Sequence, residues 1–573
     1  MARIGATEGA RIVVIRLLNV LMLLVLSSLV AVSVLRHLSY PLLWNDEAET
    51  VVYGDRILDY GYPKIHDGRN VIYELLAPLE VGTKKANDAY IGSTWGQYYF
   101  AAPGAAWARG TDDPWEKTLK VRLPFALAGL AGLAVLFLAA TVGWVSNVDR
   151  RLQLASLFAL LVLLSTSLVL HLREARHYPL VVLLVGSCLL VHIRRTVLGR
   201  MGFRTYLASQ TVLLLLLFNV FSLPWFAIVG GLGLERLYFF FRRDEPIRLR
   251  LVRLTRDLSP LVCSAVLLVP VWLYFETFQI AAVLSKLPVR FTPTEHFAAL
   301  LKYFLGYSTL LPSSAAKVAA LVALRRSGGA SIPACVRIAT QVSDLFWLVV
   351  LAYVACTSLL PFSYERYVLV LLPILMLTLL IDGTTVFTMA RVETSRAASR
   401  VLVACLGLAW LGSAAWLLPL RLAELRLHNV ELEVPYRGPL DFAVEWIRRE
   451  YAHPEQLVIA TNYEQPALVY YLGSHVIIGS IGANLPQDLE FQPDLIIWRP
   501  WNLQRNALAE LTERDRYHAV RFDVANLPYN NIPQLVPSVF VPLTHQFTTP
   551  LPADRSKRFM ILRRAPNPGA KEP

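Results

Sequence analysis

Two adjacent carboxylates, Asp46 and Glu47, are the first candidates for chemistry in this chain. They follow the first long apolar segment by a few residues and precede a pattern typical of a helix over 48–60. That helix would lie along a membrane surface, which would hold both acids at the level of a lipid-linked substrate's headgroup. The alternative is that the two acids only cap the helix, whose N-terminal end favours negative charge.

Four arginines break the charge pattern of the rest of the chain. Arg122, Arg173, Arg176 and Arg366 border apolar segments on the side that otherwise carries few basic residues. A planar guanidinium can donate two parallel hydrogen bonds to two oxygens of one phosphate. Phospholipid headgroups lie at the ends of the apolar segments, where these arginines are found. The three after residue 170 are therefore candidates for phosphate binding. Snorkelling, or pairing with nearby glutamates, is the alternative for each of them.

Weaker candidates surround this set. Lys85, beside Lys84, is a further candidate for binding the donor phosphate, although no motif aligns it with a phosphate-binding lysine. The remaining substrate-binding candidates are His66, Tyr178, Glu295 and His296. A lone Glu-His pair is common, so it does not by itself predict a metal site.

The elements that position these residues are membrane spans. The chain has 573 residues, of which 55% are hydrophobic and 17% charged, with a mean hydropathy of +0.47. Its apolar runs approach twenty residues, the length that crosses a hydrocarbon core of about 30 Å. The sequence predicts a polytopic α-helical membrane protein. Its eleven expected spans are 12–34, 122–145, 153–171, 178–193, 205–220, 223–241, 258–276, 300–323, 339–361, 367–389 and 401–420.

The distribution of the net charge of +13 indicates the orientation of the chain in the membrane and not a surface that binds nucleic acid. Most arginines lie in every second short loop between apolar runs, which predicts a cytoplasmic N-terminus. We therefore expect a multi-pass protein of the cytoplasmic (inner) membrane, in contact with membrane lipids and without a nucleic-acid partner. The five cysteines fall in apolar segments without metal-type spacing.

Two domains are expected. Residues 1–420 would form the transmembrane domain, including a long first outer loop at 35–121. Residues 421–573 would form a water-soluble, extracytoplasmic α/β domain, with helices at 440–450 and 465–471 and short strands at 457–460, 476–478, 495–498 and 559–563.

The arrangement resembles the GT-C superfamily of membrane glycosyltransferases. Within it, the chain is similar to bacterial relatives of dolichyl-phosphate-mannose–protein mannosyltransferases and lipid A aminoarabinose transferases. The segments that carry the resemblance are Asp46-Glu47, 61–68, 173–179, 365–367, 462–466 and 470–473. The aminoarabinose transferases have more than eleven spans, so the resemblance leaves the acceptor open.

The resemblance implies a GT-C-like fold and an inverting transfer outside the cytoplasmic membrane. A polyprenyl-phosphate sugar would be the donor, and a lipid, glycan or protein hydroxyl the acceptor. Asp46 would take the acceptor proton, Glu47 would help to hold the acceptor, and the arginines would neutralise the departing phosphate. No cofactor is expected. Members of the superfamily differ in metal dependence, so a divalent metal ion stays open.

Two other function classes compete with this interpretation. A lipid or sugar transporter would line a path with charges inside the spans, where Asp344 and Asp382 are the visible acids. A non-catalytic scaffold would use the outer domain to recruit partners, and the acids of the first loop would then be dispensable.

Overall fold

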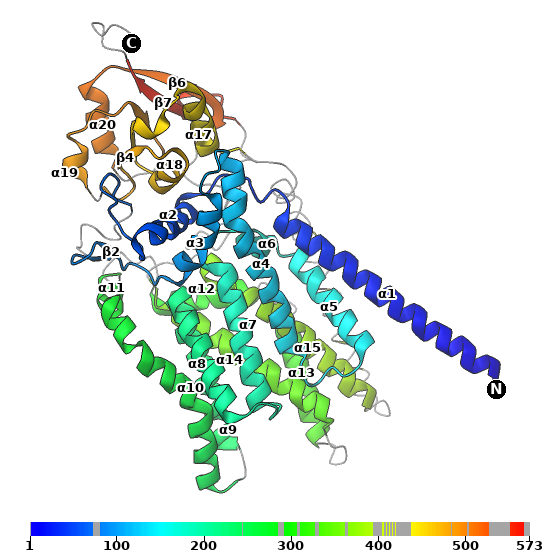
Figure 1. Ribbon diagram of the computed structural model, residues 1–573. Coiled ribbons are helices and arrows are strands. Elements are labelled where there is room, and N and C mark those ends of the chain that lie inside the picture. The colour runs from blue at the N-terminus through cyan, green and yellow to red at the C-terminus, as the bar shows by residue number, and fades with distance from the viewer. Residues whose placement is uncertain are drawn as a thin grey trace.

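A computed structural model shows a helical bundle with a smaller α/β domain at one end (Figure 1). The residues it describes are 2–72, 81–242, 245–284, 292–305, 310–326, 332–360, 365–392, 437–482, 484–500, 504–526 and 551–565, with isolated positions between 401 and 419.

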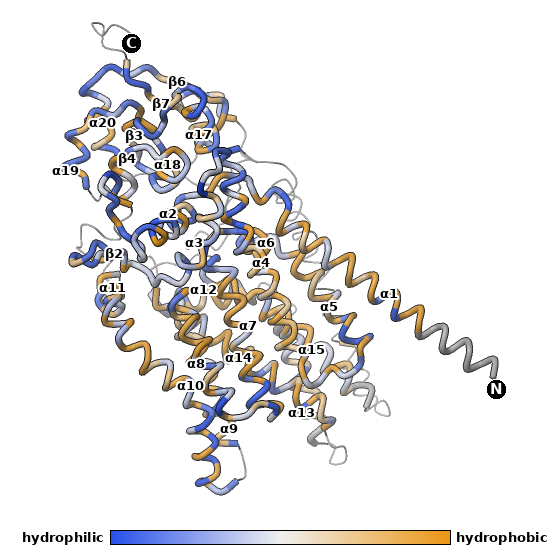
Figure 2. The backbone as a smooth tube through the Cα atoms, in the orientation of Figure 1, coloured by the Kyte–Doolittle hydropathy of each residue, from blue (hydrophilic) through white to orange (hydrophobic). Residues whose placement is uncertain are grey.

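Seven helices in the described residues are long and apolar enough to cross a membrane. Figure 2 shows their hydrophobic stretches side by side below the more hydrophilic α/β domain. The N-terminal helix diverges from the others, and only 17% of its apolar window is buried, so most of its surface is free to face lipid. The seven are α1 (Ala2–Leu35), α4 (Pro114–Thr141), α7 (His177–Thr196), α8 (Phe203–Val220), α10 (Ile247–Tyr274), α14 (Ala334–Ser358) and α15 (Leu371–Val392).

Three further predicted spans are occupied by helices that are shorter or more polar. The span expected at 401–420 lies largely outside the described residues. The chain is thus a polytopic membrane protein, with seven spans supported by length and composition. The helices at the three other places are α5 (Val148–Leu163) followed by α6 (Thr166–His171), α9 (Ser222–Arg242), and α12 (Pro293–Leu305) followed by α13 (Leu310–Arg326).

A charged cluster joins three helices inside the bundle. The Lys317 ammonium on α13 lies 3.2 Å from Asp344 Oδ1 on α14 and 3.1 Å from Asp382 Oδ1 on α15. The Ser343 hydroxyl donates to Asp382 at 2.5 Å. Charges at this depth are tolerated when they are paired, so the two acids hold α13, α14 and α15 together.

The first outer loop forms a layer between the bundle and the α/β domain. It contains α2 (Asn45–Tyr60), α3 (Gly96–Ala108) and a short hairpin of β1 (Thr83–Lys84) and β2 (Ala89–Tyr90). The helix α2 ends at Gly61, whose φ of 81° favours glycine. The helix α2 packs between α3 and α18 (Gln465–Leu472), and Trp44 and Tyr53 are buried. Its position along the membrane surface stays a prediction.

The C-terminal domain is built on a five-stranded sheet of order β4-β3-β5-β7-β6. The strands β4, β3 and β5 run parallel to one another, and β7 runs antiparallel to both of its neighbours, β5 and β6. The predicted helices and strands are confirmed, whereas β6 and α20 were not predicted. Its strands and main helices are α17 (Pro439–Glu450), β3 (Val458–Thr461), α18, β4 (His475–Ile478), α19 (Leu485–Asp488), β5 (Leu495–Ile497), α20 (Arg505–Arg514), β6 (Tyr517–Ala525) and β7 (Arg558–Arg564).

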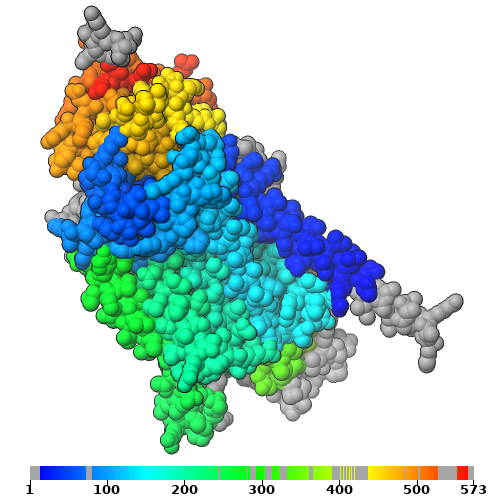
Figure 3. All heavy atoms as spheres, viewed as in Figure 1, coloured from blue at the N-terminus to red at the C-terminus, as the bar shows by residue number. Residues whose placement is uncertain are grey.

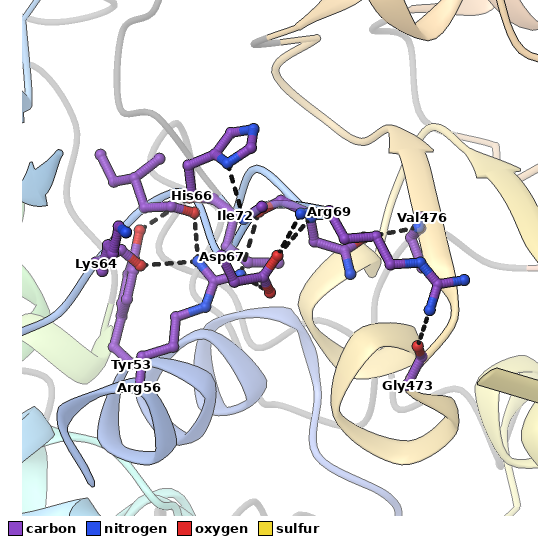
Figure 4. A network of polar contacts seen from close by, with 12 residues as sticks. Tyr53, Arg56, Lys64, His66, Asp67, Arg69, Ile72, Gly473 and Val476 are labelled. Carbon is purple, nitrogen blue, oxygen red and sulfur yellow. Dashed lines mark hydrogen bonds and ion pairs between the residues drawn. The ribbon is translucent and has the colours of Figure 1, made fainter. Parts of the chain in front are cut away.

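Polar contacts fasten this domain to the first outer loop (Figure 4). The buried Asn70 amide donates to the Ser474 carbonyl at 3.1 Å and accepts from the Val476 amide at 2.8 Å. Near the start of α2, the amide of Leu42 donates to Asp441 at 2.8 Å. Asn70 therefore binds the backbone of β4 much as a neighbouring strand would, and the domain is seated directly above α2 (Figure 3).

Candidate active site

The site is built on a buried ion pair. Glu47 is fully buried, and both of its oxygens accept from the Arg122 guanidinium, at 2.8 and 2.5 Å. Glu47 also accepts from the amide of Ala175 at 2.7 Å, while Arg122 donates to two carbonyls that follow α1. This pair joins α2 and α4 to the turn before α7. Since both Glu47 oxygens are engaged, the structure gives it a positioning contact and leaves it no open face.

Asp46 points the other way, towards two of the predicted arginines. Its Oδ2 lies 3.5 Å from Arg176 Nη2 and 3.6 Å from Arg366 Nη2. Its side chain is 23% exposed. The fold thus brings together three side chains that are separated by 130 and 190 positions in the sequence. The Asp46 carboxylate faces two cations and is partly exposed.

Glu49 is a third carboxylate in this cluster. It lies 3.7 Å from Arg176 and accepts from the Tyr98 hydroxyl at 3.2 Å. Burial raises its pKa to about 7, although the positive charge of Arg176 opposes this. Arg176 also donates to the Thr50 hydroxyl at 2.9 Å. Glu49 and Thr50 therefore hold the guanidinium that faces Asp46.

Aromatic rings surround the second arginine. The Arg366 guanidinium lies over the Trp44 ring at 5.1 Å and over the Tyr367 ring at 5.6 Å, both within cation–π range. Beside it is a crevice of about 190 Å³, lined in part by His177, Tyr178 and Arg366. A site with two guanidiniums and apolar, aromatic walls suits a phosphate joined to a lipid chain.

The C-terminal domain closes the site from above. Burial raises the pKa of Tyr463, and the charges of Glu464, Asp46 and Arg366 also act on its hydroxyl. Tyr463 follows strand β3, in the loop at the carboxyl edge of the parallel strands, the edge at which open α/β sheets bind ligands. The predicted resemblance at 462–466 therefore falls on the part of the domain that faces Asp46.

The other predicted site residues lie away from Asp46. Arg173 is buried and donates to the Arg36 carbonyl at 2.6 Å, and Lys85 is exposed in the turn of the β1–β2 hairpin. His66 accepts from the Gly68 amide at 3.0 Å (Figure 4). Glu295 caps α12 by accepting from Thr292 at 2.9 Å, and His296 is buried on the same helix. Their proposed parts in substrate binding remain predictions.

One carboxylate of the cluster, Glu49, was not singled out from the sequence. For Glu49 a signal existed, because residues three apart share a helix face and Asp46 precedes it by three. The helix period does not predict the contact that Tyr98 makes with Glu49 from α3. Within the described parts of the chain, no group of three or more His, Cys, Asp or Glu side chains could hold a metal ion.

No family model matches the sequence, and no curated protein matches it. Among solved structures, the chain is similar to ArnT from Cupriavidus metallidurans in the apo state, with 14% identity, 95% of this chain and 97% of that chain covered, and a TM-score of 0.50. It is also similar to the archaeal oligosaccharyltransferase AglB from Archaeoglobus fulgidus, solved with an inhibitory peptide and a dolichol-phosphate. That match has 12% identity, 93% and 75% coverage and a TM-score of 0.48. The chain has the GT-C fold that ArnT represents.

Proposed function

We propose, from the premise of a GT-C fold, that this chain is an inverting membrane glycosyltransferase that uses a polyprenyl-phosphate sugar. The observation that carries the proposal is Asp46, a partly exposed carboxylate whose Oδ2 faces Arg176 and Arg366. A carboxylate at this position could accept the proton of an acceptor hydroxyl. Glu47 and Glu49 are buried, so Asp46 is the carboxylate of the cluster that a substrate can reach.

The donor phosphate would bind where the two arginines face Asp46. Guanidiniums pair with phosphate oxygens, and Arg176 is also the N-cap of α7, an end of a helix that favours anions. A phosphate at this position would compete with Asp46 for both cations. Binding the donor would therefore weaken the hold of the two arginines on the Asp46 carboxylate.

The transfer then follows in one displacement. As the acceptor oxygen bonds to the anomeric carbon, its proton moves to Asp46, and the bond from that carbon to the phosphate oxygen breaks. The polyprenyl phosphate leaves with the electron pair and gains negative charge, which Arg176 and Arg366 stabilise. Attack from the face opposite the leaving group inverts the sugar carbon, without a covalent intermediate on the protein.

The membrane supports this assignment of substrates. The site lies at the end of the bundle next to the α/β domain, so a lipid-linked donor could reach it from one leaflet (Figure 1). The charge pattern of the loops supports an orientation with this end outside the cytoplasm and the N-terminus inside. A transporter would need accessible charges within the spans, but Asp344 and Asp382 are paired with Lys317. The pairing favours the enzyme.

Transfer from a polyprenyl-phosphate sugar by the purified Asp46→Asn variant tests the proposal. The amide keeps the shape and removes the base, so we expect kcat to fall by about 10²–10⁴-fold with little change in stability. Asp59→Asn is the matched control, because Asp59 lies on the same helix, 2.8 Å from Arg109 at the surface. If Asp46→Asn turns over like wild type, Asp46 is not the base.

A further inference from the structure

A second cationic site lies at the opposite end of the bundle from the α/β domain. There the end of α9 and the start of α10 form a hairpin that projects beyond the neighbouring helices (Figures 1 and 3). Residues 241–257 hold six arginines against three acids, a local excess of positive charge that the proposed transfer reaction does not use.

The hairpin forms a pocket that is open to solvent and has a volume of about 260 Å³. Its walls combine three guanidiniums with two phenylalanine rings and one leucine, a mixture that suits an anionic group attached to an apolar body. The lining residues are Arg236, Phe239, Phe240, Arg250, Arg253, Leu254 and Asp257.

Two of the three arginines are neutralised within the protein. Arg236 forms a close pair with Glu235 and lies 3.2 Å from Asp257, so it is held by two acids. Arg253 lies 2.9 Å from Glu245. Neither arginine is free to supply a full charge to a ligand.

Arg250 is different. It donates to the Phe240 carbonyl at 3.2 Å, and its guanidinium lies over the Phe240 ring at 5.4 Å. Its Nε is buried and has no hydrogen-bond partner, and no carboxylate lies within 4 Å of it, among the residues that the structure describes. A buried N–H without a partner is unfavourable, so this group would be stabilised by an acceptor in the pocket.

The outer surface of the hairpin has the composition of a membrane interface. Ile247, Leu249 and Leu251 are about half exposed and alternate with arginines, and Phe241 is 74% exposed. In water this surface would be unfavourable, whereas at the level of lipid headgroups the apolar side chains meet acyl chains and the arginines meet phosphates.

We propose that this pocket binds the phosphodiester of an anionic phospholipid, with Arg250 as its principal ligand. The guanidinium would donate two parallel hydrogen bonds to the phosphate oxygens, and the phenylalanine rings would contact the glycerol and upper acyl chain. The net positive charge of the hairpin selects anionic over zwitterionic headgroups. The site is independent of the sugar transfer, and its occupancy would anchor α9 against α10.

The test measures binding of phosphatidylglycerol to the detergent-purified full chain. The rise in the unfolding temperature of the protein with lipid concentration reports the binding. Phosphatidylcholine and inorganic phosphate serve as comparison ligands. Arg250→Ala is the test variant, and Arg248→Ala is the matched control, since Arg248 is exposed on the same helix and does not line the pocket. We expect phosphatidylglycerol to stabilise the wild-type protein in a saturable way. Arg250→Ala should reduce the affinity about fivefold, which corresponds to about 1 kcal/mol for one basic residue. Arg248→Ala should keep the affinity within about twofold of wild type.

Three results would overturn the proposal: equal losses in the two variants, equal stabilisation by phosphatidylcholine, or saturation by inorganic phosphate alone. The first would mean that the site is diffuse charge, the second that it does not select anionic lipid, and the third that it binds free anions. If Arg250→Ala does not fold, Arg250→Gln keeps the stem over Phe240 and removes the charge, so the same comparison applies.

Discussion

Glu47→Gln should separate the two adjacent carboxylates, Asp46 and Glu47, by their effects on stability. The substitution keeps the size of the side chain but removes the charge that Arg122 faces at 2.5 and 2.8 Å. Arg122 is 6% exposed, so its guanidinium would remain buried without its counter-ion. Asp46→Asn, one residue earlier, removes a partly exposed charge and should leave stability almost unchanged.

The magnitude follows from what Arg122 retains. Breaking a buried pair from one side generally destabilises by about 3–5 kcal/mol. Arg122 would still donate to the carbonyls of Leu38 and Pro41 at 3.1 and 2.7 Å, which places the expected loss near the lower bound, at about 3 kcal/mol. The same loss releases the turn at Ala175 that holds Arg176, so activity should fall together with stability.

Denaturant unfolding of the detergent-solubilised protein, followed by tryptophan fluorescence, measures the free energy of unfolding. Glu116→Gln is the matched control on α4, because Glu116 pairs with Lys120 at 2.7 Å with half of its side chain exposed, and such pairs contribute at most about 1 kcal/mol. A Glu47→Gln protein within about 0.5 kcal/mol of wild type would refute the assignment of Glu47 as the buried anchor of the site.

Three further predictions concern the surroundings of Asp46. Burial raises the pKa of Glu49 to about 7 from about 4.5 in the unfolded chain, so its contribution to stability is complete below pH 4.5 and is lost as pH rises through 7, by about 3 kcal/mol. Thermal unfolding between pH 5 and 8 should show this slope in wild type and a flatter one in Glu49→Gln; equal slopes would contradict it. Arg366→Ala should weaken use of the donor about tenfold or more in steady-state kinetics, whereas Arg109→Ala, which breaks only surface pairs, should not; equal effects would make Arg366 a structural anchor. Asn70→Ala should loosen the C-terminal domain, which limited proteolysis near residue 437 would detect as faster cleavage, and unchanged cleavage would argue against the clamp.

Much of this site was predictable from the charges and from the side of the membrane on which they lie. Arg176 and Arg366 were chosen because they lie on the face of the membrane that otherwise lacks basic residues, and the fold brings both to Asp46. That rule works because a cation tight against a span needs an anion or a headgroup nearby. Their roles in transfer remain predictions until the kinetics are measured.

Other features depend on packing that no local pattern specifies. Adjacent helix residues point about 100° apart, so the sequence shows that Asp46 and Glu47 diverge, but not which one faces the core. Arg173 meets the same outer-side criterion as Arg176, yet it binds a backbone carbonyl after α1. The strand β6 was missed although its residues alternate, because its exposed edge position leaves a weak hydrophobic signal.

The contacts that seat the C-terminal domain also set an order of assembly. Asn70 and Leu42 bind groups that lie 404, 406 and 399 positions later in the chain. During synthesis the first outer loop therefore crosses the membrane long before its partner exists, and contacts of such long range form slowly. The helix that carries Asp46 gains its last supports only when the end of the chain arrives. A chain cut before residue 437 would insert its spans and still lack a complete active site. Incompletely synthesised molecules would therefore be inactive.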